Sequence, residues 1–242
     1  MEWHRVAHSP RTWVAAMFGV ALSFLGLHVY TSLNFQDQVP SAWVGIGYST
    51  LYLSPFLPLV GAVAFGDWLA GDAESAFLAC TVTRTGLPRM LYRSSLTALL
   101  GTALLIVVSL IPATMMSLVL FPVAPGPLAG ALSGYHAPEW IFTLANVGTL
   151  TLAGACWTTV AMLVTPLILP NRYWVVGVPV IVYLLLGVLL PPTYNPMRRS
   201  DLWFYQPTVG AFWTDPLVWV GLLIVGGLIG GSLWLRKGDL LG

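Results

Sequence analysis

Six long apolar runs, separated by polar breaks, constrain this chain more than any other feature of its sequence. A helix needs about 20 mainly apolar residues, each rising 1.5 Å, to cross about 30 Å of hydrocarbon. All six runs are close to or above that length. The pattern therefore predicts an all-α, polytopic membrane protein with one transmembrane domain over residues 1–242. The six predicted transmembrane helices cover residues 13–30, 42–65, 94–121, 140–169, 174–190 and 216–235.

Composition excludes two broad classes of protein. Hydrophobic residues make up 57% of the chain and charged residues only 8%, whereas soluble domains carry about 25% charged residues. So few charges cannot cover a globule in water, which excludes an ordinary water-soluble enzyme. The formal net charge of +1 provides no basic field for a polyanion, so we expect no nucleic-acid partner.

The basic residues predict the orientation in the membrane, because Lys and Arg near helix ends are retained on the cytoplasmic side. With both termini in the cytoplasm, only Arg198 and Arg199 of the ten basic residues fall outside. The reverse orientation would place most basic residues outside. We therefore expect both termini to be cytoplasmic, together with Arg5, Arg11, Arg84, Arg89, Arg93, Arg172, Arg236 and Lys237.

Tryptophan and tyrosine near the ends of the runs support the same boundaries, since their amphipathic rings favour the headgroup level. Examples are Trp13, Tyr30, Trp140 and Trp234.

Two segments outside the predicted spans have a distinctive composition. The cytoplasmic segment 66–93 holds Asp67, Asp72, Glu74, Arg84, Arg89 and Arg93, six charges in a chain with ten basic and nine acidic residues. The outer segment 191–215, between the fifth and sixth runs, combines prolines with aromatic residues. Such a mixture predicts a short interfacial or re-entrant element rather than a loose tether. Its aromatic residues are Trp203, Phe204, Tyr205, Phe212 and Trp213.

Polar side chains inside the second and fourth runs are the candidates for a substrate path. They are Tyr48, Ser49 and Tyr52 in the second run, and Thr143, Asn146 and Thr149 in the fourth. Tyr48 and Tyr52 are four residues apart and share one helical face. The same groups also suit ordinary hydrogen bonds between membrane helices, so both interpretations stay open.

The last run contains two overlapping G-x-x-x-G pairs, in Gly226-Gly227-Leu228-Ile229-Gly230-Gly231. Such pairs allow another helix to approach closely. That helix could belong to the same chain or to a partner.

Motifs for catalysis are missing from the sequence. It contains neither the H-E-x-x-H of zinc proteases nor a G-x-S-x-G nucleophile elbow. The single lysine, Lys237, is followed by Gly238, whereas a P-loop requires Ser or Thr there. His4 and His8 are spaced for one helical face but lie in a terminal tail. We expect no catalytic residue, no metal site and no cofactor in this chain.

The order of these parts resembles the permease subunits of ABC-2 type ATP-driven transporters. The stretch that carries the resemblance begins at Gly66-Asp67-Trp68 and continues through Thr83-Arg84-Thr85 to Pro88-Arg89. It is similar to the family pattern of an acidic segment, a short apolar helix, a Thr-Arg turn and a basic residue before the third span. The ending Arg236-Lys237-Gly238-Asp239 is similar to the family tail. One departure is that Ser75 and Ala76 follow Glu74, where the family often has glycine.

The resemblance implies a membrane-spanning permease of an exporter in a bacterial cytoplasmic (plasma) membrane. It implies two copies of a separate ABC ATPase subunit, which would hold ATP and Mg, and a second permease subunit, identical or homologous. The substrate path would follow the shared interface within the lipid bilayer. The ATPase would couple to the 66–93 segment, through Asp67, Asp72, Glu74, Arg84 and Arg89.

Two other functions remain open on the sequence. The first is an ion-coupled secondary transporter; against it, none of the six runs contains Asp, Glu, Lys or Arg, the usual groups of proton relays. The second is a non-transporting membrane protein that acts in immunity, sensing or scaffolding. Nothing in the sequence excludes it.

Overall fold

The computed structural model describes residues 2–32, 41–66, 68–74, 86–123, 139–164, 172–191, 194–196 and 209–239. Within these ranges the regular structure is helical, with no strand, which confirms the all-α prediction for this part of the chain. The helices are α1 Glu2–His8, α2 Pro10–Ser32, α3 Ala42–Leu53, α4 Leu57–Gly61, α5 Trp68–Glu74, α7 Leu87–Leu120, α9 Glu139–Thr159, α11 Arg172–Leu189 and α13 Val209–Asp239. Three irregular turns join or extend them: the 3-10 turn η1 Ser54–Phe56 and the π-helical turns η2 Ala62–Gly66 and η3 Val160–Val164.

Five helices are long and apolar enough to cross a membrane, and each coincides with a predicted run. This supports a multi-pass membrane protein, as the composition predicted. The five spans are Pro10–Ser32, Ala42–Gly66, Leu87–Leu120, Trp140–Val164 and Thr214–Arg236.

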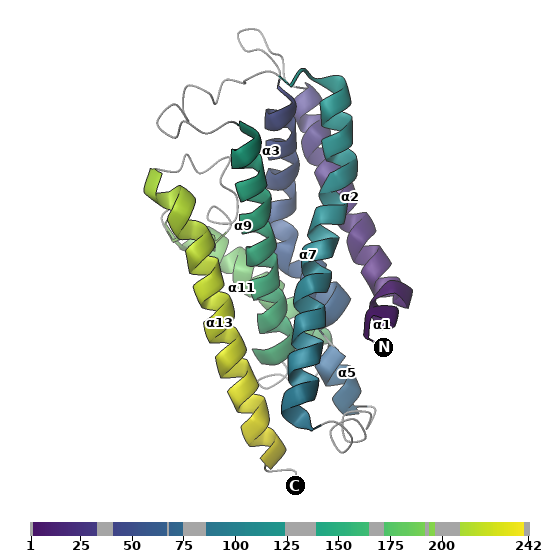
Figure 1. Cartoon of the computed structure of the whole chain (residues 1–242), viewed down its shortest axis with the longest axis vertical. Helices are drawn as coiled ribbons and strands as arrows, with labels where there is room; N and C mark the ends of the chain where they lie inside the picture. Colours follow the sequence, from purple (N-terminus) through teal and green to yellow (C-terminus); the bar gives the residue numbers. More distant parts are fainter. Residues whose placement is uncertain are drawn as a thin grey trace.

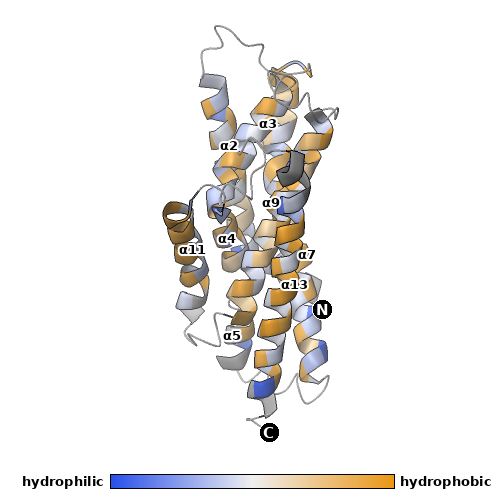
Figure 2. Ribbon diagram, turned by 90° about the vertical axis from the view of Figure 1, so that its left-hand side faces the viewer, coloured by the Kyte–Doolittle hydropathy of each residue, from blue (hydrophilic) through white to orange (hydrophobic). Residues whose placement is uncertain are grey.

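The fifth predicted run corresponds to α11, which differs from the other five. Its apolar stretch, Val176–Leu189, is shorter than the stretches of the other candidate spans. In Figure 2 it stands at one side of the bundle, away from α7 and α13. The sixth transmembrane helix therefore stays a prediction.

The long helices form one bundle, seen from the side in Figure 1. Helices α2, α3, α7 and α9 pack against one another, and α13 packs more extensively against α9 and η3 than against α7. The short helix α5, the beginning of α7 and the C-terminus lie at the same end of this bundle (Figure 1).

Small residues and hydroxyl groups let these helices approach closely. A Cβ atom added at Gly26 of α2 would collide with the backbone carbonyl of Tyr48 in α3. Ser117 of α7 donates a 2.8 Å hydrogen bond from Oγ to the carbonyl oxygen of Ala42. Between α7 and α9, the hydroxyls of Thr102 and Thr158 lie 3.0 Å apart. Close packing of this kind replaces the hydrophobic driving force, which lipid does not supply.

Tyr30, at the end of α2, fixes the beginning of α3. Its Oη donates to the carbonyl oxygen of Ser41 at 3.1 Å and accepts from the backbone N–H of Ser41 at 2.8 Å. The ring is almost fully buried and packs against the rings of Tyr48 and Phe121. We call this contact the Tyr30 clasp.

Prolines explain why the second span is irregular. Pro55 and Pro58 lie in the first turns of η1 and α4, and because proline lacks an N–H it interrupts the helical hydrogen bonds. The span ends in the π-helical turn η2, which packs against the other π-helical turn, η3. The indole N–H of Trp234 in α13 donates to the carbonyl oxygen of Leu163 in η3 at 2.9 Å, satisfying one polar group at that turn.

Candidate functional site

A buried polar contact joins the second and fourth spans, which hold the predicted substrate-path residues. Asn146 of α9 donates from Nδ2 to Thr50 Oγ1 of α3 at 2.9 Å. Thr50 Oγ1 in turn donates to the carbonyl oxygen of Gly47 at 2.8 Å. Both side chains are completely buried, so this chain of hydrogen bonds lies inside the bundle rather than facing lipid.

The neighbouring hydroxyls are buried as well, and two of them bond to their own helix. Ser49 Oγ donates to the carbonyl oxygen of Gly45 at 3.1 Å, and Thr149 Oγ1 to that of Ala145 at 2.9 Å. Bonds to the residue four positions earlier are the usual way for Ser and Thr to satisfy a hydroxyl inside a helix. We call the buried residues Ser49, Thr50, Thr143, Asn146 and Thr149 the α3–α9 polar seam.

The two tyrosines of the predicted path lie at the margin of this seam. Tyr48 and Tyr52 are half-buried. The Tyr48 ring packs against Tyr30, with ring centroids 5.2 Å apart. Of the predicted path residues, Asn146 donates a hydrogen bond that crosses between the two helices, and in this structure it acts as an interhelical contact.

The second and fourth spans meet α11 near a further group of polar atoms. Tyr183 of α11 is fully buried and donates from Oη to the carbonyl oxygen of Ser54 at 2.9 Å. Trp157 of α9 packs edge-on against the Tyr183 ring, with centroids 5.2 Å apart. Within the described residues, the buried Trp157 Nε1 has no hydrogen-bond acceptor. An unmet buried donor is costly, so the packing of the described residues leaves one polar group unsatisfied here.

The sequence did not predict a role for Trp157 or Tyr183. A signal for Trp157 existed: it lies in the middle of its apolar run, whereas tryptophans of membrane helices gather at the ends, near the headgroups. For Tyr183 we find no comparable signal, because its partner, Ser54, lies 129 residues earlier in the chain.

The predicted coupling residues are only partly described. Asp72 lies in α5 and is buried, with 9% of its surface exposed, while Arg89 is exposed in the first turn of α7. Helix α5 packs against η3 and α11, which explains why Asp72 is withdrawn from solvent. Glu74 ends α5, but its side chain lies outside the described residues, as do Asp67 and Arg84.

The predicted outer element is described at its two ends. Asn195 follows α11 and donates from Nδ2 to the carbonyl oxygen of Gly187 at 2.6 Å, so the chain turns back on the end of that helix. At the other end, Phe212 and Trp213 belong to the first turns of α13, followed by the buried Asp215. Trp203, Phe204 and Tyr205 lie outside the described residues.

No group of three or more His, Cys, Asp or Glu gathers as metal ligands in the part of the chain that the structure describes. His4 and His8 are exposed on α1, with ring centroids 4.0 Å apart. Two imidazoles alone leave a metal ion short of the usual four ligands of zinc.

Comparison with known protein families, with curated proteins and with solved structures finds no match to this chain. The fold and the site define a multi-pass helical membrane protein whose α3–α9 polar seam is built from hydroxyls and one amide.

Proposed function

We propose that this chain is the membrane-spanning permease subunit of an ATP-driven exporter of the ABC-2 type, in a bacterial cytoplasmic membrane. It would form the substrate path and couple to a separate ATPase, present in two copies and holding ATP and Mg. A second permease subunit, identical or homologous, would complete the complex. The proposal rests on the resemblance in sequence, and the structure adds two supporting observations.

The observation that carries the proposal is the position of α5. This short helix follows directly after the second candidate span and lies at the same end of the bundle as the beginning of α7 and the C-terminus (Figure 1). Arg89 is exposed at that end. A soluble ATPase that docked here would contact α5, and α5 packs against η3 and α11, so a push on α5 would reach the fourth span.

The chemistry of the interior supports the same function. The α3–α9 polar seam contains amide and hydroxyl groups and no titratable carboxylate, imidazole or amine. Proton and ion carriers usually place such groups in the path. A seam without them suits a transporter whose energy comes from a separate subunit.

The same chemistry gives a substrate class. Asn146, Thr50 and the Trp157 indole N–H offer neutral hydrogen bonds among apolar side chains. We infer an uncharged or amphiphilic substrate, of lipid-like, peptidic or drug-like character. A highly charged polysaccharide or an inorganic ion would find no counter-charge in the seam.

The test is to isolate the full chain in mild detergent from its native membrane and to measure ATP hydrolysis in the preparation. We expect a nucleotide-binding protein in stoichiometric amounts. Arg89→Glu should lower its recovery several-fold, because it reverses an exposed charge beside α5. Arg11→Glu is the matched control: it makes the same charge change at an exposed site on α2.

Two outcomes would contradict the proposal. One is a preparation that contains no ATP-hydrolysing partner. The other is substrate accumulation in reconstituted vesicles that follows an imposed ion gradient without ATP, which would favour a secondary transporter. Asp72 is unsuitable for this test, because reversal of a buried charge disturbs folding as well as docking.

A further inference from the structure

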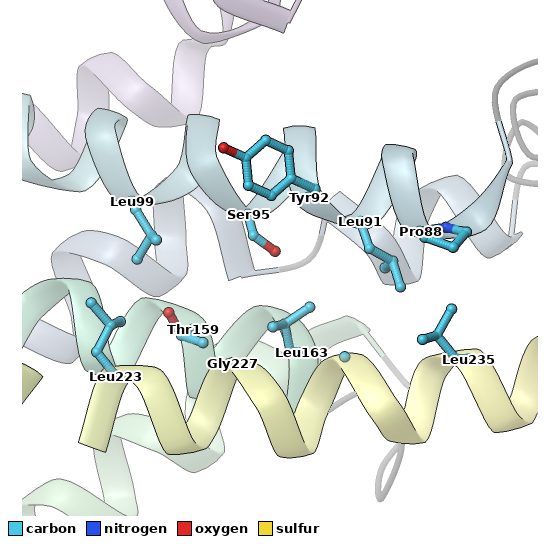
Figure 3. A pocket seen from close by; sticks show the side chains of 11 residues that line it. Pro88, Leu91, Tyr92, Ser95, Leu99, Thr159, Leu163, Leu223, Gly227 and Leu235 are labelled. Atoms are coloured by element: carbon cyan, nitrogen blue, oxygen red, sulfur yellow. The ribbon is translucent and has the colours of Figure 1, made fainter. Parts of the chain in front are cut away.

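A crevice separates α7 from α13 along the half of the bundle that ends at the C-terminus. Its volume is about 280 Å³, and α7, the end of α9, η3 and α13 line it (Figure 3). Leu91, Leu99, Leu223 and Leu235 project into it from the two long helices (Figure 3). The crevice exists because α13 packs mainly against α9 and η3 and touches α7 less.

Two glycines on α13 leave space in the crevice, because they carry no side chain. Gly227 and Gly231 lie in its lining, and a Cβ atom added at either would meet nothing within 4 Å. Gly230 differs: a Cβ atom there would lie 2.7 Å from the Cβ of Leu163. Close helix packing therefore accounts for Gly230, whereas Gly227 and Gly231 border open space.

The lining of the crevice favours an apolar occupant. Leucines and glycines make up most of it, and Tyr92, Ser95 and Thr159 contribute its hydroxyls. Lipid tails are the apolar molecules that surround a membrane helix, and an unbranched acyl chain can lie along a crevice that runs between two helices.

Two exposed arginines directly follow lining residues at one end of the crevice. Arg89 follows Pro88 on α7, and Arg236 follows Leu235 on α13. Their guanidinium groups can reach past the apolar lining to the membrane surface, as long basic side chains do near helix ends.

Two guanidinium groups beside an apolar crevice match one ligand chemistry. Arginine binds phosphate through paired, charge-assisted hydrogen bonds. Basic pockets between membrane helices bind anionic lipid headgroups on that basis. A zwitterionic lipid presents a compensating cation beside its phosphate and gains less from the arginines.

We propose that the crevice between α7 and α13 is a specific binding site for an anionic phospholipid. One acyl chain lies on Gly227 and Gly231, and the headgroup phosphate is bound by Arg89 and Arg236. The site is separate from the α3–α9 polar seam. It shares Arg89 with the proposed ATPase contact, so Arg236→Gln tests the lipid site independently of the permease function.

The test is native mass spectrometry of the purified full chain, titrated in mild detergent with dioleoyl phosphatidylglycerol or with dioleoyl phosphatidylcholine. We expect one phosphatidylglycerol to be retained in preference to phosphatidylcholine. Each of Arg89→Gln and Arg236→Gln should weaken its binding by about fivefold. Arg11→Gln removes the same charge from α2, which does not line the crevice, and should leave the affinity unchanged.

Filling the crevice tests the acyl-chain contact. We expect the double variant Gly227→Leu/Gly231→Leu to lose the preferential phosphatidylglycerol, while Gly221→Leu/Gly226→Leu retains it. The control glycines also lie on α13 with nothing within 4 Å of an added Cβ, but they do not line the crevice. The arginine variants change exposed side chains only, so they test the site even if the leucine variants fold poorly.

Three results would overturn the proposal. The first is equal retention of the two lipids by the unaltered chain. The second is unchanged phosphatidylglycerol binding in both the arginine and the crevice-filling variants. The third is a crevice-filling variant that alters the oligomeric state and leaves lipid retention as before, which would make a second copy of the chain the occupant.

Discussion

The second and fourth spans are less apolar than the last span but more deeply buried, which is the opposite of the relation found in soluble proteins. In Ala42–Gly66 and Trp140–Val164, 67% of the most apolar window is buried, compared with 17% in Thr214–Arg236, although the last span is the more apolar. In water, the most apolar helix would be the most buried. Here lipid accepts apolar side chains, so small and polar residues mark the interior.

The largest expected effect is at Gly26, inside the bundle. Gly26→Ala places a Cβ against the Tyr48 carbonyl, and a backbone atom cannot rotate away as a side chain can. We expect stability to fall by roughly 2 kcal/mol, measured by thermal or chemical unfolding in detergent. Gly221→Ala, on the open face of α13, should be neutral. Equal effects of the two variants would remove the distinction between interior and periphery.

Gly230 marks the place where the peripheral helix α13 meets the interior. Gly230→Ala should cost about 1 kcal/mol, because the new Cβ must displace Leu163 or α13 itself. The control is Gly226→Ala, four residues earlier in the same G-x-x-x-G pair, where an added Cβ meets nothing within 4 Å. A loss of stability at Gly226 as large as that at Gly230 would show that a second helix covers this face.

A double-mutant cycle measures the α3–α9 polar seam. Asn146→Ala and Thr50→Val each remove one side of the hydrogen bond between the two helices. We expect a coupling energy of about 0.6 kcal/mol, the average for such bonds in membrane proteins. Zero coupling would mean that the seam does not hold the helices together, which would leave Asn146 to a role in the substrate path alone.

The smallest effect is expected on the lipid-facing side. Leu228 of α13 is 69% exposed, and since lipid surrounds it before and after folding, Leu228→Ala should change stability by less than about 0.5 kcal/mol. The same unfolding measurement on the protein isolated in mild detergent from its native membrane, with any bound subunit retained, extends the comparison. A loss above 1 kcal/mol there would identify this face as an interface with another subunit.

Hydropathy was sufficient to locate five spans, because each apolar run is long enough for a helix to cross the hydrocarbon core. It could not predict η2 and η3, since neither Ala62–Gly66 nor Val160–Val164 contains a residue that requires a π-helical turn. The fifth run stays a prediction, because the apolar length of α11 falls short of the other spans.

The polar residues show a similar division. The residues of the α3–α9 polar seam could be recognised in the sequence as hydroxyls and an amide inside apolar runs. Their pairing could not be predicted, because the bond from Asn146 to Thr50 joins residues 96 positions apart. Trp234 was predicted to lie at the headgroup level, but its burial and its hydrogen bond to Leu163 could not be predicted from its place in the run. The resemblance implied a coupling role for Asp72, and it gave no sign that α5 packs against η3 and buries this side chain.

The Tyr30 clasp bears on whether the protein tolerates an insertion or a chain break between α2 and α3. One phenol meets both polar atoms of the Ser41 backbone, 11 residues away, so the register of α2 and α3 is held at the base of the connection rather than by its length. Doubling a flexible connection costs only about 0.6 kcal/mol. A reporter domain inserted between Ser32 and Ser41, or two fragments expressed separately, should therefore still reunite the hairpin, and Tyr30→Phe should abolish that complementation.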